Sequence, residues 1–470
     1  MWVLSRPSVR VRPLPGARGA IVEAVRRREV GSAAKYGHAR PPDLSAPHRL
    51  PEWVIRSTEM RSGPRTLITP PMAVLVQKYG GTSVEGPERI RAVARRIAAA
   101  RAAGNDLLVV VSAMGQTTDE LLRLAQEISA SPNRRELDML LTTGERVTMS
   151  LLAMALGDLG VPAISFTGSQ SGILTDAGHG AARIIDVRPE RLRRELEQGK
   201  VVIVAGFQGV NPATKEITTL GRGGSDTTAA ALAAAFGRAR CEICTDVAGV
   251  FSADPRAVPA ARVIPRLDYR VCSTLAHLGG RVLHARCVDL AAREGVPLVV
   301  RSSFDESPGT EIGVFEMEGP RVEAVAHRGD CSIAVAEGNA GGRGEARGLL
   351  EAVADAFPEL ELVAHEREAD AHHALVWTGS REDVEALQKD FRTLRGPGGE
   401  WALRVEHGAA FVSVVGLGLG AREAAQAEEM LERADVPLVA LRVSPTALIF
   451  RVPNERVEDA ARALHRGLVE

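Results

Sequence analysis

The sequence predicts an α/β fold with a mainly parallel sheet covered by helices on both faces, followed by two smaller α+β units. Between residues 72 and 310, short apolar runs alternate with longer amphipathic stretches of helical period. Such alternation is typical of parallel strands that are joined by crossover helices. Between residues 322 and 470 one order of strands and helices occurs twice, which predicts the two smaller units.

Six apolar runs have the length expected of buried strands. These runs are residues 74–77, 107–111, 163–166, 201–205, 241–245 and 298–301. Six further stretches have the apolar spacing and the length of helices. These stretches are residues 87–103, 118–129, 135–159, 189–198, 226–236 and 282–294.

The first 71 residues differ in composition from the rest of the chain. They contain 13 Arg or Lys residues against five Asp or Glu residues, with many prolines and no sustained apolar period. Such a segment cannot bury enough apolar surface for a packed core, so we expect a disordered basic extension. Three interpretations are open: a transit-like targeting segment, a basic tail that binds an acidic partner, or a segment that is not translated.

Composition limits the class of protein. A length of 470 residues suggests roughly two to four domains. A formal net charge of −1 argues against a general nucleic-acid-binding protein, and no apolar run is long enough to span a bilayer. Five cysteines form no disulfide-like framework, which indicates a reducing compartment. The composition therefore predicts a cytoplasmic protein without nucleic-acid or membrane partners.

Cys241 and Cys244 have the spacing of a metal-binding or redox pair. They lie in a strand-like run, however, and the chain has no second pair of this kind and no nearby histidines at metal-ligand spacing. We therefore interpret them as thiols of a buried strand and predict no metal site.

A glycine-rich run at residues 218–228 lies between an apolar strand-like stretch and an alanine-rich helical stretch. Glycines in this position let backbone N–H groups approach an anion closely, and the start of the following helix directs its positive end at the same place. Arg222 adds a guanidinium suited to a carboxylate or phosphate, Ser225 can cap the helix, and Asp226 places a carboxylate nearby. The run therefore predicts a phosphate-binding loop.

Lys78 stands at the end of the first apolar run, directly before a tight turn that contains Gly80 and Gly81. Ligands of open α/β sheets bind at the carboxyl ends of strands. A lysine at such an end is suited to neutralising phosphate charge, although lysines near strand ends also serve as solubilising residues.

Seven motifs occur in order between residues 78 and 256, and together they resemble the aspartate kinase family. The motifs are KYGGTS at 78–83, VSAMG at 111–115, TTD at 117–119, LTTGER at 141–146, GFQG at 206–209, GRGGSDTT at 221–228 and TDVAGVFSADPR at 245–256. The resemblance implies the three-layer amino acid kinase fold for residues 72–315. It implies an ATP-dependent kinase that phosphorylates the side-chain carboxylate of L-aspartate. It also favours translation from Met72, which stands six residues before Lys78.

The acceptor determines what the catalytic residues must do. The side-chain carboxyl group of free aspartate has a pKa of about 3.9, so it is already an ionised nucleophile at neutral pH. The enzyme must position the two anions and offset their repulsion while the γ-phosphoryl group moves. Lys78, Gly80, Gly81 and the loop 221–224 are suited to that task. The resemblance implies that Asp226 organises the catalytic lysines.

Recognition of an amino acid requires partners for both of its charged ends. A guanidinium suits the α-carboxylate and a carboxylate suits the α-ammonium, so we expect Arg222 and Glu145 to bind them. We expect three hydroxyl groups to complete this site, those of Ser112, Thr118 and Ser225. Taken alone, Glu145 would better fit a helix-surface carboxylate paired with Arg146 or solvent; its match to the family motif favours the binding role.

The resemblance implies that the segment after the fifth expected strand holds ATP, with Mg²⁺ carried by the nucleotide. The residues concerned are Thr245, Asp246, Phe251, Asp254 and Arg256. Phe251 stands where the family leads us to expect tyrosine, and Arg281 stands where it usually has lysine. The two cations are not interchangeable at a tight site, so these differences affect the expected rate more than the expected reaction.

The two C-terminal units, at residues 322–405 and 409–470, resemble the paired ACT domains of this family. The general alternative is a pair of structural or dimerising domains. The loop at 337–344 and the loop at 416–422 both lack the Pro-Gly typical of effector loops. An effector amino acid needs charged partners for both ends, so we expect weak or absent inhibition by lysine and threonine, and a homo-oligomer held by these domains.

The sequence thus predicts an aspartate kinase for the first step toward lysine, threonine and methionine, with weakened feedback regulation. Two alternatives stay open. One is a kinase for glutamate or another small amino acid, and the other is a poorly active regulatory or scaffolding relative. Lys78, Arg222 and Asp226 argue against the second alternative, while the altered stretch at 269–281 favours it.

Overall fold

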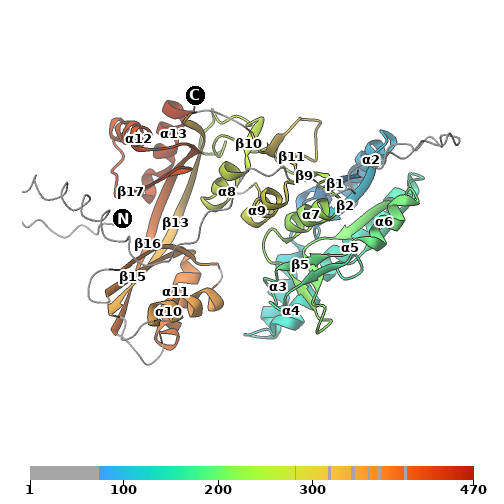
Figure 1. Cartoon of the computed structure of the whole chain (residues 1–470), viewed down its shortest axis with the longest axis horizontal. Helices are drawn as coiled ribbons and strands as arrows, with labels where there is room; N and C mark the ends of the chain where they lie inside the picture. Colours follow the sequence, from blue (N-terminus) through green and yellow to red (C-terminus); the bar gives the residue numbers. More distant parts are fainter. Residues whose placement is uncertain are drawn as a thin grey trace, which may run out of the picture. The chain divides into compact units, whose positions relative to one another are not determined.

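The structure is a computed structural model that describes residues 74–280, 282–315, 319–339, 344–357, 359–367, 372–395 and 400–469. The predicted basic extension lies outside the described residues, as do Met72 and Arg281. The described part contains two large sheets, one in each half of the sequence, and one small sheet (Figure 1). No helix of the described residues is both long enough and apolar enough to cross a membrane.

The first large sheet has eight strands in the order β10-β12-β11-β9-β1-β2-β6-β3. All neighbours are parallel except β11 and β12, so the predicted mainly parallel sheet is confirmed. The strands are β1 (Val74–Tyr79), β2 (Asp106–Val111), β3 (Ala163–Phe166), β6 (Val201–Ala205), β9 (Arg240–Thr245), β10 (Arg266–Asp268), β11 (Leu298–Ser302) and β12 (Thr310–Gly313). The sequence analysis missed β10 and β12, which are short strands at one edge of the sheet.

Helices cover both faces of this sheet, as predicted. Alternate residues of β2 point to opposite faces: Leu108 and Val110 belong to one apolar core, and Leu107 and Val109 to another. The first core contains residues of α6 (Glu190–Glu197), α7 (Gly224–Ala235), α8 (Tyr269–His277) and α9 (Ala285–Glu294). The second contains residues of α2 (Pro87–Ala102) and α5 (Thr143–Asp158). Burial on both faces explains why the strands read as continuous apolar runs.

One stretch expected to be a single helix is two helices. The sequence analysis predicted a helix over 135–159, but α4 (Arg134–Leu141) ends before Thr142 and α5 begins after it. The backbone carbonyl of Thr142 accepts a hydrogen bond from the Gln208 side chain at 3.2 Å. This tertiary contact, which no local pattern reveals, coincides with the break. The helix α3 (Thr117–Ile128) precedes them, close to its predicted bounds.

A small four-stranded sheet was not anticipated by the sequence analysis. Its order is β5-β4-β7-β8, and its strands are β4 (Ile173–Thr175), β5 (Ile184–Val187), β7 (Gln208–Val210) and β8 (Ile217–Thr219). Strands of three or four residues are too short to show an alternating pattern. This sheet matters because β8 leads directly into the glycine-rich loop.

The second large sheet has six strands in the order β14-β15-β13-β16-β18-β17. The strands are β13 (Arg321–Asn339), β14 (Glu361–Arg367), β15 (His372–Gly379), β16 (Glu400–Leu417), β17 (Ala440–Ser444) and β18 (Ala447–Pro453). One apolar core packs α10 (Glu345–Ala356) and α11 (Arg381–Leu394) against it. Another packs α12 (Ala421–Arg433) and α13 (Val457–Leu468).

The long strands β13 and β16 are shared by both α+β units. Residues 321–328 of β13 pair with the second half of β16, which in turn pairs with β18. After an irregularity between Arg328 and Ile333, the remainder of β13 pairs with β15 and with the first half of β16. The segment of β13 that pairs within the second unit, residues 321–328, thus comes before the rest of the first unit in the chain. The bounds 322–405 and 409–470 stay a prediction.

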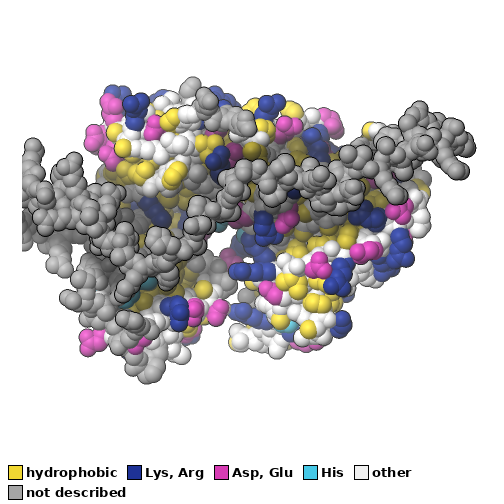
Figure 2. All heavy atoms as spheres, viewed as in Figure 1, with side chains coloured by type: hydrophobic (Ala, Val, Ile, Leu, Met, Phe, Trp, Pro, Cys, Tyr) yellow, Lys and Arg dark blue, Asp and Glu magenta, His cyan; other side chains and the backbone are white. Residues whose placement is uncertain are grey.

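The five cysteines are buried free thiols. Cys241 and Cys244 lie in β9 at the centre of the parallel sheet, and burial raises the pKa of Cys244 to about 12. On the face drawn in Figure 2, acidic and basic side chains are interspersed over the described surface.

Candidate functional site

A cavity of about 320 Å³ opens at the carboxyl ends of β1 and β2, where the helix α7 begins. Its lining includes seven of the residues that the sequence analysis selected for catalysis and acceptor binding, together with Gly81. The seven residues are Lys78, Ser112, Thr118, Glu145, Arg222, Ser225 and Asp226. The structure thus brings together side chains from five segments of the chain, spread over about 150 positions.

Lys78 and Asp226 form a close ion pair inside this cavity. The Lys78 Nζ lies 2.6 Å from Asp226 Oδ1, and the two side chains are only 10% and 12% exposed. Asp226 lies in the first turn of α7, where the positive end of the helix dipole favours a negative charge. The ion pair fixes the lysine ammonium beside the first turn of α7, next to the glycine-rich loop.

The glycine-rich loop has a backbone path that only glycine allows at Gly223. This residue has φ +66°, and a Cβ atom built on it would lie 2.2 Å from the Cβ of His284. It is the N-terminal cap of α7, so the loop turns directly into the helix. The first turn of α7, residues 224–226, lines the cavity, and the N–H of Gly224 donates to the Gly221 carbonyl at 3.0 Å. The positive end of the helix therefore lies at the cavity, where it favours an anion.

Glu145 is a buried carboxyl group in the first turn of α5. Its Oε1 accepts a hydrogen bond from the backbone N–H of Ala113 at 3.2 Å, whereas its Oε2 is buried and has no hydrogen-bond partner among the described residues. Burial raises the pKa of Glu145 to about 7. Gly144 makes this arrangement possible, because a Cβ there would lie 2.7 Å from the Ala113 side chain.

Arg222 lies at the open side of the same cavity. Its side chain is 83% exposed, and its Nε lies 3.9 Å from a carboxylate oxygen of Glu359. Such an exposed pair contributes little to stability, so the guanidinium is available to another carboxylate. The hydroxyl residues Ser112, Thr118 and Ser225 line the cavity together with it.

A second cavity, of about 720 Å³, contains the residues that the sequence analysis selected for the nucleotide. Its lining includes Thr245, Asp246, Phe251, Asp254 and Arg256. Arg281 lies outside the described residues, although its neighbours Gly280 and Val282 line this cavity. Gly80 lines neither cavity, but its N–H donates to the carbonyl of Cys244 at 3.2 Å, directly before Thr245. Both cavities therefore adjoin the same edge of the sheet.

Asp254 and Arg256 bond one another within this lining. Arg256 Nη2 lies 2.7 Å from Asp254 Oδ2, and hydrogen bonds from Arg256 are the main cause that lowers the pKa of Asp254. The Arg256 side chain is 79% exposed, so its guanidinium can also reach an anion in the cavity.

Sequence reasoning missed several lining residues. The first cavity also contains Phe207, a residue at φ +69°, in the GFQG motif whose role had not been assigned. The second cavity contains residues 325–329 of β13, more than 60 positions after the nucleotide motif. His327 and Arg328 are among them. No local signal marks these residues, because they belong to a strand of the C-terminal sheet.

The chain is similar to known proteins along most of its length. A model of the amino acid kinase family matches residues 73–302. The aspartokinase of Mycobacterium tuberculosis strain H37Rv is 44% identical over an alignment of 405 residues, which covers 84% of this chain and 96% of that protein. The aspartokinase of Corynebacterium glutamicum is 43% identical over 403 residues, with the same two shares. The crystal structure of E. coli aspartokinase III in complex with aspartate and ADP has a TM-score of 0.70 at 25% identity, covering 84% of this chain and all of that one.

Proposed function

Because this chain belongs to the aspartokinase family, we propose that it transfers the γ-phosphoryl group of ATP to the side-chain carboxylate of L-aspartate. One observation supports this function above the others. A single cavity combines the Lys78–Asp226 ion pair with Glu145, whose buried Oε2 has no hydrogen-bond partner among the described residues. A cation suits the transferred phosphoryl group, and an unsatisfied carboxylate suits a cationic group of the acceptor.

The proposed mechanism is charge neutralisation and positioning. The acceptor carboxylate is ionised at neutral pH and needs no strong base, so the main obstacle is its repulsion from the phosphates. Lys78 offsets this repulsion, and Asp226 holds the ammonium group of Lys78 in place through the 2.6 Å ion pair. The N–H groups at the start of α7 and the turn at Gly81 supply further donors.

The proposed binding of aspartate uses both of its remaining charged groups. Glu145 binds the α-ammonium, which satisfies the buried Oε2. Arg222 binds the α-carboxylate. Glu359 competes with the substrate for this guanidinium only weakly, because its carboxylate oxygen lies 3.9 Å from the Nε of Arg222 and both side chains are exposed. Three hydroxyl groups, those of Ser112, Thr118 and Ser225, orient the acceptor between these ends.

ATP occupies the 720 Å³ cavity in this proposal. Phe251 offers an aromatic face to the base, Arg256 and Arg281 supply positive charge, and Thr245, Asp246 and Asp254 offer polar groups. Mg²⁺ enters with the nucleotide. Among the described residues there is no group of three or more acidic, histidine or cysteine side chains that could hold a metal, so the phosphates would be its main ligands.

The pathway and its control are also part of the proposal. Aspartyl phosphate would supply lysine, threonine and methionine synthesis. A structure of E. coli aspartokinase III contains lysine together with aspartate, and it is similar to this chain at a TM-score of 0.64. The candidate effector loops of this chain lack the Pro-Gly expected of them, which supports weakened inhibition. Residues 340–343 of the first loop lie outside the described residues.

The test is an assay of the purified full chain for aspartate-dependent ADP formation, with hydroxylamine trapping of the acyl phosphate. Lys78→Ala serves as the inactive control. Product with aspartate and not with glutamate, lost in the control, is the expected result. Product with glutamate instead would support the kinase for another small amino acid. No product with ATP and Mg²⁺ would support the regulatory or scaffolding relative.

A further inference from the structure

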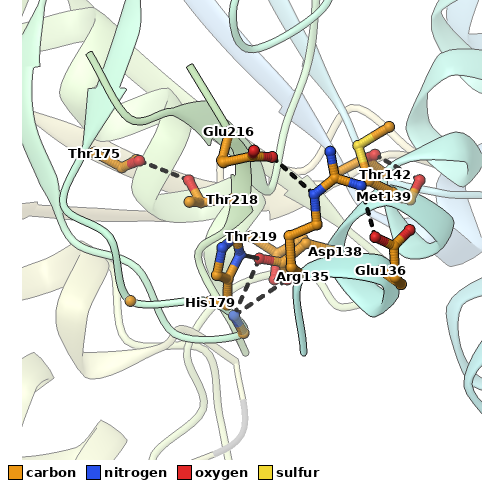
Figure 3. A network of polar contacts seen from close by, with 12 residues as sticks. Arg135, Glu136, Asp138, Met139, Thr142, Thr175, His179, Glu216, Thr218 and Thr219 are labelled. Carbon is orange, nitrogen blue, oxygen red and sulfur yellow. Dashed lines mark hydrogen bonds and ion pairs between the residues drawn. The ribbon is translucent and has the colours of Figure 1, made fainter. Parts of the chain in front are cut away.

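Asp138 is a buried carboxylate that lies outside both cavities, and it bonds to three different groups (Figure 3). Its Oδ2 lies 2.6 Å from the Nδ1 of His179, and its Oδ1 accepts a hydrogen bond from the Thr219 hydroxyl at 2.6 Å. The backbone N–H of Gly180 lies 3.1 Å from Oδ1. Because carboxylate oxygens only accept, the Nδ1 of His179 carries the hydrogen of that bond.

The three bonded groups come from the two segments that support the glycine-rich loop. Thr219 is the last residue of β8, two positions before Gly221. His179 and Gly180 belong to a turn whose backbone touches the loop: a Cβ atom on Gly221 would lie 3.1 Å from the Gly180 carbonyl oxygen. Asp138 therefore joins α4 to the strand before the loop and to the turn beside it.

A second contact holds the same two segments from another side. Arg286 of α9 donates one hydrogen bond to the Leu220 carbonyl and another, at 2.9 Å, to the Ala182 carbonyl. The start of the loop is thus fixed by Asp138 at Thr219 and by Arg286 at Leu220. Arg222 follows two residues later and has an exposed side chain, so its position depends on how the backbone before it is held.

We propose that Asp138 and His179 are positioning residues that hold the loop 221–224, and with it the guanidinium of Arg222, in the geometry that binds the acceptor α-carboxylate. This inference rests on the proposed function only for the identity of the acceptor. Neither side chain lines the cavity, so both act through the loop. Such a role predicts an effect on KM for aspartate, and on kcat through the donors at the start of α7, rather than on KM for ATP, since the nucleotide cavity lies on other segments.

His179 offers the sharper test, because its side chain is 22% exposed and its replacement need not disturb the core. His179→Leu removes the donor to Asp138. His179→Asn keeps an N–H donor close to the Nδ1 position. We expect the leucine variant to raise KM for aspartate at least fivefold and to lower kcat, with KM for ATP within twofold of the natural protein. We expect the asparagine variant to restore KM for aspartate to within twofold.

The matched control is Arg135→Met combined with Glu216→Gln. The Nε of Arg135 donates to Oε2 of Glu216 at 2.8 Å, so this pair also joins α4 to the segment before β8, and neither residue bonds Asp138 (Figure 3). The two side chains are 42% and 37% exposed, so the fold should tolerate the loss of their ion pair. We expect KM for aspartate in this double variant to stay within twofold. An equal rise in the control and in His179→Leu would overturn the inference, because it would indicate a general effect of loosening the sheet.

Hydrogen–deuterium exchange of residues 219–224 gives a readout that does not depend on activity. The expected result is faster exchange in His179→Leu than in the natural protein, the asparagine variant or the control. Unchanged exchange together with an unchanged KM for aspartate would refute the role. If the natural protein itself shows no aspartate-dependent activity, the proposed function fails, and the exchange measurement still decides whether Asp138 and His179 hold the loop.

Discussion

Ser252 and His465 share a buried hydrogen bond of 2.8 Å between Oγ and Nε2, although 213 positions separate them. Ser252 lies between Phe251 and Asp254, in the segment that lines the larger cavity. His465 belongs to α13, the last helix of the chain. Arg462 of the same helix donates to the Ala257 carbonyl at 2.9 Å. The last helix therefore supports one wall of the candidate nucleotide site.

Replacement of His465 should weaken ATP binding specifically. The hydroxyl of Ser252 accepts a hydrogen bond from the Arg262 N–H at 3.0 Å and shares a second hydrogen bond with the Nε2 of His465. His465→Leu removes this second partner in a buried place, which costs about 1–3 kcal/mol. We expect KM for ATP to rise about tenfold with KM for aspartate little changed. Steady-state kinetics with each substrate varied in turn measures both constants.

A glutamine at position 465 is the matched comparison, because its amide can donate or accept a hydrogen bond near the place of Nε2. We expect His465→Gln to lie between the natural protein and the leucine variant. Ser252→Ala with His465→Leu should cost little more than either change alone, since both remove one bond. Additive losses would mean that the two residues act independently and would contradict the shared role.

Loss of the ion pair at Lys78 should abolish turnover. Lys78→Met removes the charge that offsets anion repulsion and leaves the nearly buried Asp226 without its partner. We expect kcat to fall about a thousandfold, the size typical for a lost charge-stabilising group. The matched control is Lys200→Met, because Lys200 also forms a 2.6 Å ion pair, with Glu195, but lies outside both cavities. A similar loss in both variants would point to general destabilisation.

Aspartate binding should depend on pH through Glu145. Burial raises the pKa of Glu145 to about 7, so below that pH most molecules carry this carboxyl group in its protonated form. A protonated carboxyl group cannot form an ion pair with the α-ammonium. We expect kcat/KM for aspartate to fall about tenfold per pH unit below 7, and Glu145→Gln to be low and flat across the range. A flat profile for the natural protein between pH 5.5 and 8 would exclude Glu145 as the binding anion.

The same group should lower the stability of the ligand-free protein at high pH. Below about pH 4.5 the carboxyl is protonated in both the folded and the unfolded state, so it has no net effect. Between 4.5 and 7 the unfolded chain releases its proton more readily, so the folded state loses stability as pH rises, by about 3 kcal/mol in total. Glu145→Gln avoids this loss. We expect its melting temperature to exceed that of the natural protein at pH 8 and not at pH 5, as measured by calorimetry.

Feedback inhibition should be weak. The loop at 416–422 lies between β16 and α12, and the N–H of Gly420 bonds the Glu423 side chain at 2.8 Å, so this helix start is already capped. We expect lysine or threonine at millimolar concentration to change the rate by less than twofold. Titration of each amino acid, singly and together, into the kinase assay measures this. Strong inhibition near physiological concentration would show that these loops bind an effector despite their altered sequence.

The predictable parts of the molecule were those with a local signal. Lys78 and Asp226 were selected because each belongs to a motif at the junction of an apolar strand and a turn or helix, and the structure brings them together. The main parallel sheet was predictable because its strands are buried on both faces and read as continuous apolar runs.

The parts that escaped prediction depend on contacts between distant residues. Asp138 and Thr219 are 81 positions apart, and Ser252 and His465 are 213 apart. Neither pair leaves a periodic pattern in the sequence. The strands of the small sheet were missed for a different reason, because three residues cannot display an alternation. Tertiary contacts and very short strands were therefore the limits of sequence reasoning in this chain.

The shared strands make the first α+β unit an insertion. The chain passes from the second unit's part of the shared sheet into the first unit's part near Cys331 and returns at Ala409, and these two residues are partners across the ladder between β13 and β16. Residues 332–408 thus have the topology of an insertion between two neighbouring points of one ladder, and the strand segment at 325–329 that lines the larger cavity precedes it.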